Sequence, residues 1–476
     1  MGQAALNILP VTARLLVEGG DKRIQLDPLR NVNRYGCGPT PDPNLLDYSS
    51  ATASVVSTTA FAAANRLRER LEQDMRYLAP DAIYERELAR IRSELLALCE
   101  LGDLPEPDIV IAASGTDLHR IAAQLAQAAS DLPALVLMVD ETETGSGIRA
   151  AITDMSPAIE VATVALRMAD GLPRSAAEID AQFTKLALQA HAAGRHVLLI
   201  QADISKTGMI APGYGVTAAL QQALGSQLDV LIDACQFRIA PATLRACLAR
   251  GYSVALTGSK FVGGPSFSSA LIIPAGTAGQ FRQRPLPRKL ANFSAAADWP
   301  ACWAVREVLE RSWNFGLLLR WDAALSELHA FRSLRDIDAT RFLQTFAQAM
   351  QDRLSGNPAY SAVAVPRLDR SALLENSGWD QIQTIFPFQL YRVTDSGRQA
   401  LNTEQTLQVY RGLPTAAMHC QLGQPVNYST EHNALRLCLS ARLVVQAVAN
   451  QGKDGERIIT QAFTVLDQAA RLAQST

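Results

Sequence analysis

The hydrophobic pattern of the chain changes near residue 108. In residues 60–78 and 84–98, apolar side chains recur at helical spacing with charges between them, which predicts two helices. From residue 108 onward, short continuous Val, Ile and Leu runs alternate with stretches of helical spacing. Such runs are typical of strands in a sheet whose two faces are both covered by helices. The predicted strands are 108–112, 134–140, 160–166, 196–202, 229–234, 252–256 and 269–273.

Helical patterns lie between these runs. Residues 117–129 and 175–193 are predicted helices, and Ser175 and Glu178 have the spacing of a capping box at the start of the second one. Strands that alternate with helices along a chain form mainly parallel sheets. The sequence therefore predicts a doubly wound α/β domain with about seven strands.

The pattern changes again after residue 275. A connection rich in Pro, Arg and Gly spans residues 275–300. Beyond it the sequence predicts helices at 303–328, 340–354 and 455–473, and short strands at 384–392, 416–422 and 434–439. We therefore expect an N-terminal arm with loops (1–60), a large α/β domain (61–295) and a smaller C-terminal α+β domain (296–476).

Composition narrows the class of protein. The chain has 476 residues, of which 48% are hydrophobic and 19% charged, so it can bury a large core and a second, smaller one. The net charge is -2 and no basic stripe occurs, which argues against a nucleic-acid partner. No apolar window is long enough to cross a membrane, and residues 1–9 lack the features of a signal peptide.

Cysteine usage points to a reducing compartment. The seven cysteines are scattered, odd in number and never spaced as CxxC. Disulfide frameworks and zinc sites need paired or clustered cysteines. We therefore expect a cytoplasmic protein with no bound metal and no membrane association.

Two charged residues stand at the ends of predicted strands. Lys260 follows the strand 252–256 among small hydroxyl and glycine residues, and Asp233 lies near the end of the strand 229–234. A lysine and a carboxylate placed in this way suit a pyridoxal phosphate site, in which the lysine forms a Schiff base and the carboxylate keeps the pyridine nitrogen protonated. The alternatives are a surface or capping lysine and an N-cap aspartate.

A third candidate is the turn Ser114-Gly115-Thr116, which connects the strand 108–112 to the helix 117–129. Backbone amides and the helix dipole at such a turn bind phosphate, and hydroxyl groups add further donors. Many strand-to-helix turns have a similar sequence, so an ordinary turn is the alternative.

Four segments in this order resemble a known family. They are Ser114-Gly115-Thr116, Ser205-Lys206-Thr207-Gly208, Asp233-Ala234-Cys235-Gln236 and Thr257-Gly258-Ser259-Lys260. Their order and spacing are similar to those of the fold type I pyridoxal phosphate enzymes, and most similar to the class V aminotransferase and cysteine desulfurase group. The resemblance covers residues 105–275 well and the flanks loosely. It implies a large domain with a mainly parallel sheet and a smaller α+β domain.

The resemblance implies a role for each matching residue. Lys260 would form the Schiff base and later act as general acid and base, while Asp233 would partner the pyridinium nitrogen. Gln236 would hydrogen-bond the phenolic oxygen of the cofactor. Thr257 and Ser259 would add phosphate ligands to those of residues 114–116.

Ser205 and Arg436 would complete the site. Ser205 matches a polar residue near the cofactor oxygen or the substrate carboxylate, although a plain turn is an equal alternative. Arg436 resembles the C-terminal arginine that holds the α-carboxylate of the substrate, because a guanidinium group matches a carboxylate in two places. Arg442 is a weaker alternative for this role.

Two cysteines invite a functional interpretation. Cys420 could form a persulfide as in the desulfurases, but it lies close ahead of Arg436, and a buried structural cysteine is the better interpretation. Cys37 belongs to an N-terminal loop, and such arms line the substrate entrance in this family.

The sequence also departs from the family pattern. Ser259 replaces the histidine usual in cysteine desulfurases, which argues against that activity. The family places a ring that stacks on the cofactor just after the strand 134–140, whereas residues 140–147 contain acids and no ring. This acidic loop is either solvated, the preferred interpretation, or binds a cationic group of the substrate.

The resemblance implies a pyridoxal phosphate enzyme that acts on an amino acid through an external aldimine and a Cα carbanion. It would be a transferase or lyase, and aminotransfer, β-elimination and γ-replacement all remain open. A catalytically idle relative that serves as a binding or scaffold protein is the alternative. A nucleotide-binding enzyme is disfavoured because neither GxGxxG at the first strand nor GxxxxGK[ST] occurs. The family implies a homodimer with shared active sites, contacting through residues 60–78 and 262–268.

Overall fold

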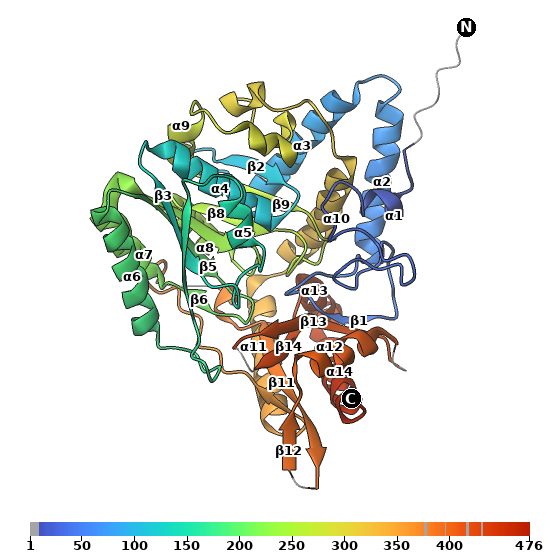
Figure 1. Ribbon diagram of the computed structural model, residues 1–476. Helices are drawn as coiled ribbons and strands as arrows, with labels where there is room; N and C mark the ends of the chain where they lie inside the picture. Colours follow the sequence, from blue (N-terminus) through green and yellow to red (C-terminus); the bar gives the residue numbers. More distant parts are fainter. Residues whose placement is uncertain (1–8, 376–377, 396, 416–417, 430–431) are drawn as a thin grey trace.

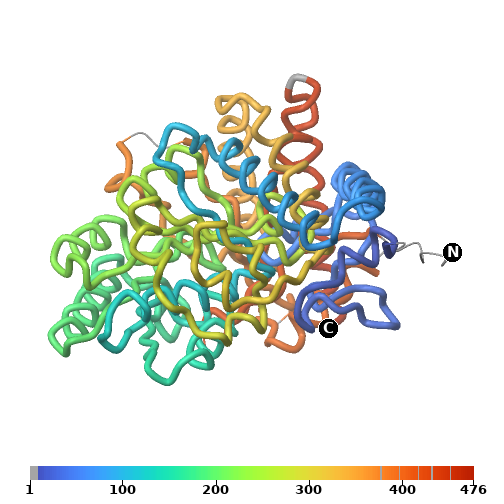
Figure 2. Tube along the Cα trace, turned by 90° about the horizontal axis from the view of Figure 1, so that it is seen from above, coloured from blue at the N-terminus to red at the C-terminus, as the bar shows by residue number. Residues whose placement is uncertain are grey.

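The computed structural model describes residues 9–375, 378–395, 397–415, 418–429 and 432–476. Within them the chain forms two sheets, each covered by helices (Figure 1). Viewed from above, N-terminal segments lie beside C-terminal ones (Figure 2), and strand β1 (Leu46–Tyr48) joins the C-terminal sheet. None of the described helices is long and apolar enough to cross a membrane.

The larger sheet has eight described strands in the order β2-β9-β8-β7-β5-β3-β4, with β6 paired to β5. Neighbours from β4 to β8 along this order run parallel, and β9 runs antiparallel to both β2 and β8. The strands are β2 (Asp108–Ala112), β3 (Ala134–Val139), β4 (Glu160–Val164), β5 (His196–Asp203), β6 (Ile210–Ala211), β7 (Leu228–Ala234), β8 (Ser253–Thr257) and β9 (Ser269–Ile273).

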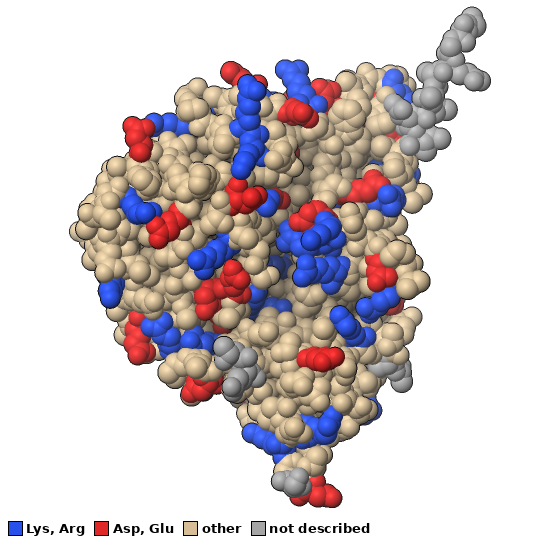
Figure 3. Space-filling model, in the orientation of Figure 1, with Lys and Arg blue, Asp and Glu red and all other residues tan. Residues whose placement is uncertain are grey.

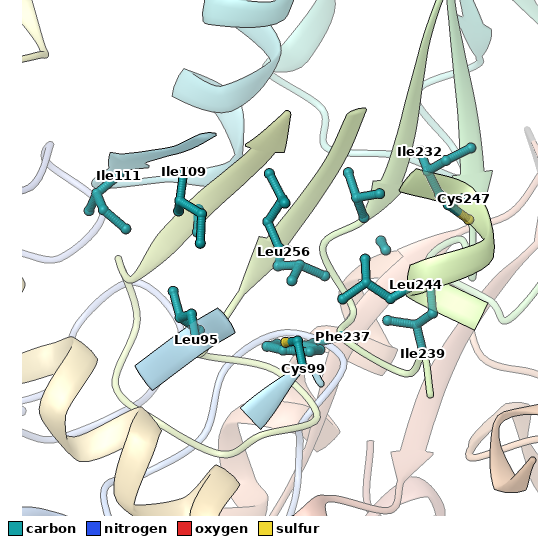
Figure 4. Close-up of a cluster of buried hydrophobic side chains, with 14 of the residues drawn as sticks. Leu95, Cys99, Ile109, Ile111, Ile232, Phe237, Ile239, Leu244, Cys247 and Leu256 are labelled. Carbon is teal, nitrogen blue, oxygen red and sulfur yellow. The ribbon is translucent and has the colours of Figure 1, made fainter. Parts of the chain in front are cut away.

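Helices cover both faces of this sheet, and each face has its own hydrophobic core. One core packs the sheet against α2 (Thr58–Asp74), α3 (Pro80–Leu98), α6 (Ala176–Ala192), α7 (Tyr214–Leu224), α8 (Pro241–Ala249) and α10 (Phe315–Arg332). Figure 4 shows part of it, where side chains of α3, β2, β7, α8 and β8 converge. The opposite core uses α4 (Gly115–Ala129), α5 (Ile148–Thr153) and α9 (Ala275–Phe281).

The second sheet has the order β1-β13-β14-β11-β10, with β12 paired to β11. Only the β1–β13 pair among these described strands is parallel. The strands after β1 are β10 (Tyr360–Ala362), β11 (Ile385–Thr394), β12 (Gly397–Ala400), β13 (Cys420–Asn427) and β14 (Asn433–Cys438). A third core packs them against α11 (Asp336–Ser355), α12 (Thr403–Gly412), α13 (Ala441–Val448) and α14 (Gly455–Gln474).

The fold confirms the predicted α/β architecture and all seven predicted strands of the large sheet. The capping box at Ser175 and Glu178 is also present. The prediction of a helix from residue 303 was wrong, because residues 304–307 form a 3-10 turn and α10 begins only at Phe315. Asn314 sets this start, since its side chain accepts a hydrogen bond from the Leu317 amide at 3.0 Å. In the predicted strand 416–422, residues 416 and 417 lie outside the described residues.

A buried ion pair joins the two sheets. The Arg370 guanidinium donates to both oxygens of the Asp203 carboxylate, each at 2.9 Å, and both side chains are fully buried. Tyr214 donates a third hydrogen bond to Asp203 at 2.9 Å. Because Asp203 ends β5 and Arg370 precedes β11, this pair fixes the second sheet against the carboxyl edge of the first.

Candidate active site

A cavity of about 930 Å³ lies where the carboxyl ends of β2, β5, β7 and β8 meet, next to β14. Parallel strands end at the same edge of a sheet, which is where ligands bind in open α/β folds. Figure 3 shows basic side chains gathered around a hollow near the middle of this face. Every sequence-predicted site residue lines the cavity: Ser114, Gly115, Thr116, Ser205, Asp233, Gln236, Thr257, Ser259, Lys260 and Arg436.

Lys260 lies in the turn after β8, half-buried at the cavity wall. Its ammonium group forms neither a hydrogen bond nor an ion pair with any described residue. The turn packs closely against α10, since a Cβ at Gly258 would lie 2.6 Å from the Cβ of Ala324. The backbone beneath Lys260 is therefore held in place while its amine stays free to react.

Asp233 in β7 is paired with a histidine that the sequence analysis missed. Nε2 of His119, on α4, lies 3.2 Å from Oδ2 of Asp233, and Nδ1 of the ring lies 2.6 Å from the Gly115 carbonyl oxygen. Burial alone would raise the pKa of Asp233, but His119 and Lys260 outweigh it and hold this pKa well below its usual value. Burial alone would lower the pKa of His119, but the Asp233 carboxylate outweighs the effect of burial and raises this pKa. Asp233 is therefore a charged carboxylate inside the cavity.

Gln236 lies just beyond β7 and is buried. Its amide nitrogen donates to the Ala51 carbonyl at 3.2 Å. The amide oxygen is buried without a partner among the described residues. One end of this side chain thus remains open to hydrogen-bond a ligand, because buried polar groups are nearly always paired.

At the start of α4, the amides of Gly115 and Thr116 have no partner among the described residues, whereas the Ser114 hydroxyl is engaged. The Ser114 hydroxyl donates to the Asp117 carboxylate at 2.7 Å and accepts from the Asp117 amide at 3.3 Å, forming a capping box. The Thr116 hydroxyl accepts a long hydrogen bond of 3.4 Å from Arg23. Gly115 allows close packing, since a Cβ there would lie 3.0 Å from the Cys235 sulfur. The amides of Gly115 and Thr116 fit an anion better than the Ser114 hydroxyl does.

The two hydroxyl residues around β8 differ in their contacts. The Thr257 hydroxyl donates to the Cys235 carbonyl at 2.6 Å, which links the ends of β8 and β7. The Ser259 hydroxyl makes no hydrogen bond to any described residue, although the side chain is buried beside the cavity. Ser259 therefore has the freer hydroxyl group of the two.

Ser205 belongs to a buried network centred on Glu143. Its hydroxyl donates to the Glu143 carboxylate at 2.6 Å, and the Thr207 hydroxyl and amide donate to the same carboxylate at 2.7 and 3.1 Å. Arg167 completes the network with an ion pair of 2.8 Å. The prediction of a solvated acidic loop was wrong for Glu143, which is 1% exposed because Arg167 neutralises it.

Arg436 on β14 is a buried cation without a carboxylate partner among the described residues. It donates to the Gln424 carbonyl at 3.0 and 3.2 Å, to the Lys206 carbonyl at 3.3 Å and to the Thr52 hydroxyl at 2.7 Å. Burial lowers the pKa of this guanidinium. The group lines the cavity, so a ligand carboxylate there would supply the missing negative charge.

The weaker candidates lie away from the cavity. Arg442 pairs with Glu327 at 2.9 Å, which uses its charge within the fold. Cys420 is fully buried in β13 and its thiol contacts the Leu413 carbonyl at 3.8 Å. Burial raises the pKa of this thiol to about 11, which opposes thiolate chemistry. Cys37 is buried as well and does not line the cavity.

Sequence reasoning missed several cavity residues. His119 had a signal, since it lies one helical turn beyond the Ser114 turn on the buried face of α4. Arg23 and Tyr35 come from the irregular N-terminal arm, where no periodicity places a side chain. Ser266 had no signal either, and its buried hydroxyl has no partner in the described chain.

Comparison with known proteins reveals the fold but no close relative. No protein-family model matches the chain. No curated protein matches it significantly. Solved structures do match it over most of its length.

Three solved structures show the likeness. The cystine C-S lyase C-DES, solved with its product cysteine persulfide, has a TM-score of 0.57 at 16% identity, covering 89% of this chain and 97% of that chain. The cysteine desulfurase CsdA from Escherichia coli has a TM-score of 0.55 at 14% identity, covering 90% and 94%. Oryza sativa TDC, solved with PLP and tryptamine, has a TM-score of 0.52 at 13% identity, covering 89% and 84%.

These structural neighbours are pyridoxal phosphate-dependent enzymes of fold type I. The chain has this fold: a large, mainly parallel sheet covered by helices, with a smaller C-terminal sheet. The likeness confirms the fold that the sequence predicted. At these identities it shows the fold alone, so function has to be argued from the cavity.

Proposed function

We propose that the chain is a pyridoxal phosphate-dependent enzyme that acts on an amino acid as a transferase or lyase. The observation that carries the proposal is the charge arrangement in the cavity. A charged Asp233 braced by His119 faces the same space as Lys260, whose amine has no partner in the described chain. A ligand with an aldehyde and a ring nitrogen would use both groups.

The residues fit the cofactor at its other contacts. Gly115 and Thr116 offer backbone amides for a phosphate at the start of α4, and the open end of Gln236 would meet a ring oxygen. The unpaired hydroxyl of Ser266 gives a further polar contact. Several unsatisfied polar groups on one cavity wall are the pattern expected of a ligand site.

Pyridoxal phosphate, when bound, supplies an electron sink for a bond broken at the α-carbon of an amino acid. Asp233 would hold a proton at the ring nitrogen, because its own low pKa keeps the carboxylate charged. Lys260 would anchor the cofactor, and its amine would move a proton at the α-carbon of the substrate. Arg436 would bind the substrate carboxylate and orient the amino acid.

The test is the visible absorbance spectrum of the purified protein, before and after borohydride, followed by peptide mapping. The expected result is a yellow protein whose reduced adduct maps to Lys260. Lys260→Ala should take up cofactor without covalent attachment, and Lys185→Ala, on the exposed side of α6, serves as the control. A colourless protein that refuses added cofactor would contradict the proposal.

The same experiment distinguishes an active enzyme from a catalytically idle relative. If the protein attaches the cofactor at Lys260 but none of the amino acids tested changes its absorbance spectrum, it would be a binding or scaffold protein. An adduct on another lysine would show that the assignment of the Schiff base to Lys260 is wrong.

We also propose a homodimer in which a second copy completes the cavity. Residues 60–78 and 262–268 are the proposed contacts, and the second range is next to Lys260 in the chain. Light scattering on the cofactor-loaded protein should give twice the mass of 51.4 kDa. A single-chain mass at micromolar concentration would contradict this proposal.

A further inference from the structure

Lys206 is a second lysine of the cavity, and the proposed function gives it no task. It lies in the connection between β5 and β6, and its side chain lines the cavity with Lys260 and Arg436. The side chain is half-buried. Lys206 therefore lines the same cavity as Arg436, the proposed binding residue for the substrate carboxylate.

The backbone of Lys206 is fixed on both sides. Its amide donates to the Glu143 carbonyl at 2.8 Å, and its carbonyl accepts from the Arg436 guanidinium at 3.3 Å. The Thr207 amide next to it donates to the Glu143 carboxylate at 3.1 Å. Lys206 is thus tied directly to the proposed carboxylate-binding arginine, which gives its side chain a rigid support.

No described carboxylate pairs with the Lys206 ammonium. Nζ donates to the backbone carbonyl of Glu141 at 2.7 Å. The Glu141 side chain is exposed, and the Glu143 carboxylate is already paired with Arg167 at 2.8 Å. At least part of the hydrogen-bonding capacity of the ammonium therefore remains available to a ligand.

The electrostatic surroundings favour an added anion. Burial, followed by the Arg436 cation, lowers the pKa of Lys206 to about 8. Lys260 adds to this shift, whereas Glu143 and Glu141 oppose it. Lys206 and Arg436 are thus two cations that line the same cavity. The α-carboxylate of a substrate supplies one negative charge on Arg436, and the charge of Lys206 is left over.

We propose that Lys206 selects amino acids with an anionic side chain. This proposal rests on the proposed function, in which Arg436 binds the α-carboxylate of the substrate. The carboxylate of the substrate's side chain would then bind the Lys206 ammonium. The substrate class is then an acidic α-amino acid, and a neutral amide of the same shape would bind less tightly because it leaves the cation unpaired.

The experiment titrates the cofactor-loaded protein with L-aspartate, L-glutamate, L-asparagine and L-glutamine, following both the cofactor absorbance and the heat of binding. Wild type should bind at least one acid about 10-fold more tightly than its amide. Lys206→Met should remove this preference by weakening the acid alone. Lys206→Arg should keep most of it, and Lys185→Met is the matched control for loss of one exposed positive charge.

Equal affinity of wild type for acids and amides would overturn the inference. An equal loss of both in Lys206→Met would also overturn it, because that pattern indicates a structural role. Lys206→Gln, which keeps a polar side chain, repeats the test if the methionine variant fails to fold. A protein that takes up no cofactor at all would instead overturn the proposed function, and the inference with it.

Discussion

Two buried arginines show how the cavity differs from the junction between the sheets. Arg370 at the junction gives two hydrogen bonds of 2.9 Å to the fully buried Asp203 carboxylate. Arg436 at the cavity is almost as deeply buried, yet its partners are two carbonyls and a hydroxyl. The first cation is neutralised within the fold, and the second awaits an anion.

Burial without a carboxylate does not by itself indicate a ligand site. Arg320 is fully buried and donates to the carbonyls of Phe267 and Glu18, which holds the N-terminal arm in place. Arg238 likewise donates to Thr384 and Ser50 and lines no described cavity. The cavity is distinguished by the combination of an uncompensated cation and open space beside it.

The largest expected effect lies at the junction. Arg370→Met strands the Asp203 carboxylate in the interior, and breaking a buried pair in this way costs about 3–5 kcal/mol of unfolding free energy. Denaturant unfolding of the purified protein measures it. Adding Asp203→Asn to the same chain should recover part of the loss, since the stranded charge is then gone. A loss below about 1 kcal/mol would remove the contrast with Arg436.

The second largest effect is expected on catalysis. Asp233→Ala should reduce turnover of an accepted amino acid by about 100-fold or more while the fold stays intact, because the ring nitrogen loses its charged partner. Steady-state rates measure the turnover, and circular dichroism shows whether the fold is intact. Asp233→Asn, which keeps the shape without the charge, should be nearly as slow. Unchanged turnover in either variant would show that this carboxylate does not face the ring.

Arg436→Met should weaken substrate binding by about 10- to 100-fold, the worth of charge-assisted hydrogen bonds to a carboxylate. Its unfolding free energy should fall by less than that of Arg370→Met, because the lost partners are two carbonyls and a hydroxyl rather than a buried carboxylate. Arg436→Lys should fall between, since it keeps the charge but loses the planar fork. A stability loss equal to that of Arg370→Met would make Arg436 a structural residue.

The smallest effect is expected at Cys420. Cys420→Ala should leave turnover within about 2-fold and lower the unfolding free energy by about 1 kcal/mol, since only a small buried group is lost. The cysteine desulfurase interpretation requires the opposite result. Loss of turnover in a stably folded Cys420→Ala protein would revive the persulfide role.

Much of the fold could be predicted because burial on both faces leaves a plain pattern. The seven predicted strands of the large sheet stand out in the sequence, several of them as continuous apolar runs, whereas the two-residue strand β6 was not predicted. The start of α10 at Phe315 could not be predicted from the apolar residues ahead of it, because Trp303, Val305 and Leu309 pack into the core through a 3-10 turn and loops rather than a helix.

The candidate site divides in the same way. Lys260 and Asp233 stand out in the sequence because a charge at the end of a buried strand needs a reason. The sequence signal of His119 is weak, because a single histidine one helical turn beyond the Ser114 turn shows no repeating pattern. Glu143 was misread since its partner, Arg167, lies beyond the next strand along the chain, and only the fold brings the pair to 2.8 Å.

The sequence by itself determined the order of strands and helices, the fold type and the residues that end the strands around the cavity. Periodicity and strand-end chemistry are local, so they are legible in a linear chain. The tertiary structure decided which charges are neutralised. Arg370 meets a carboxylate, while Arg436 and Lys206 meet backbone carbonyls at a cavity wall. The energy of a buried charge depends on all its neighbours in space, and those neighbours come from distant parts of the chain.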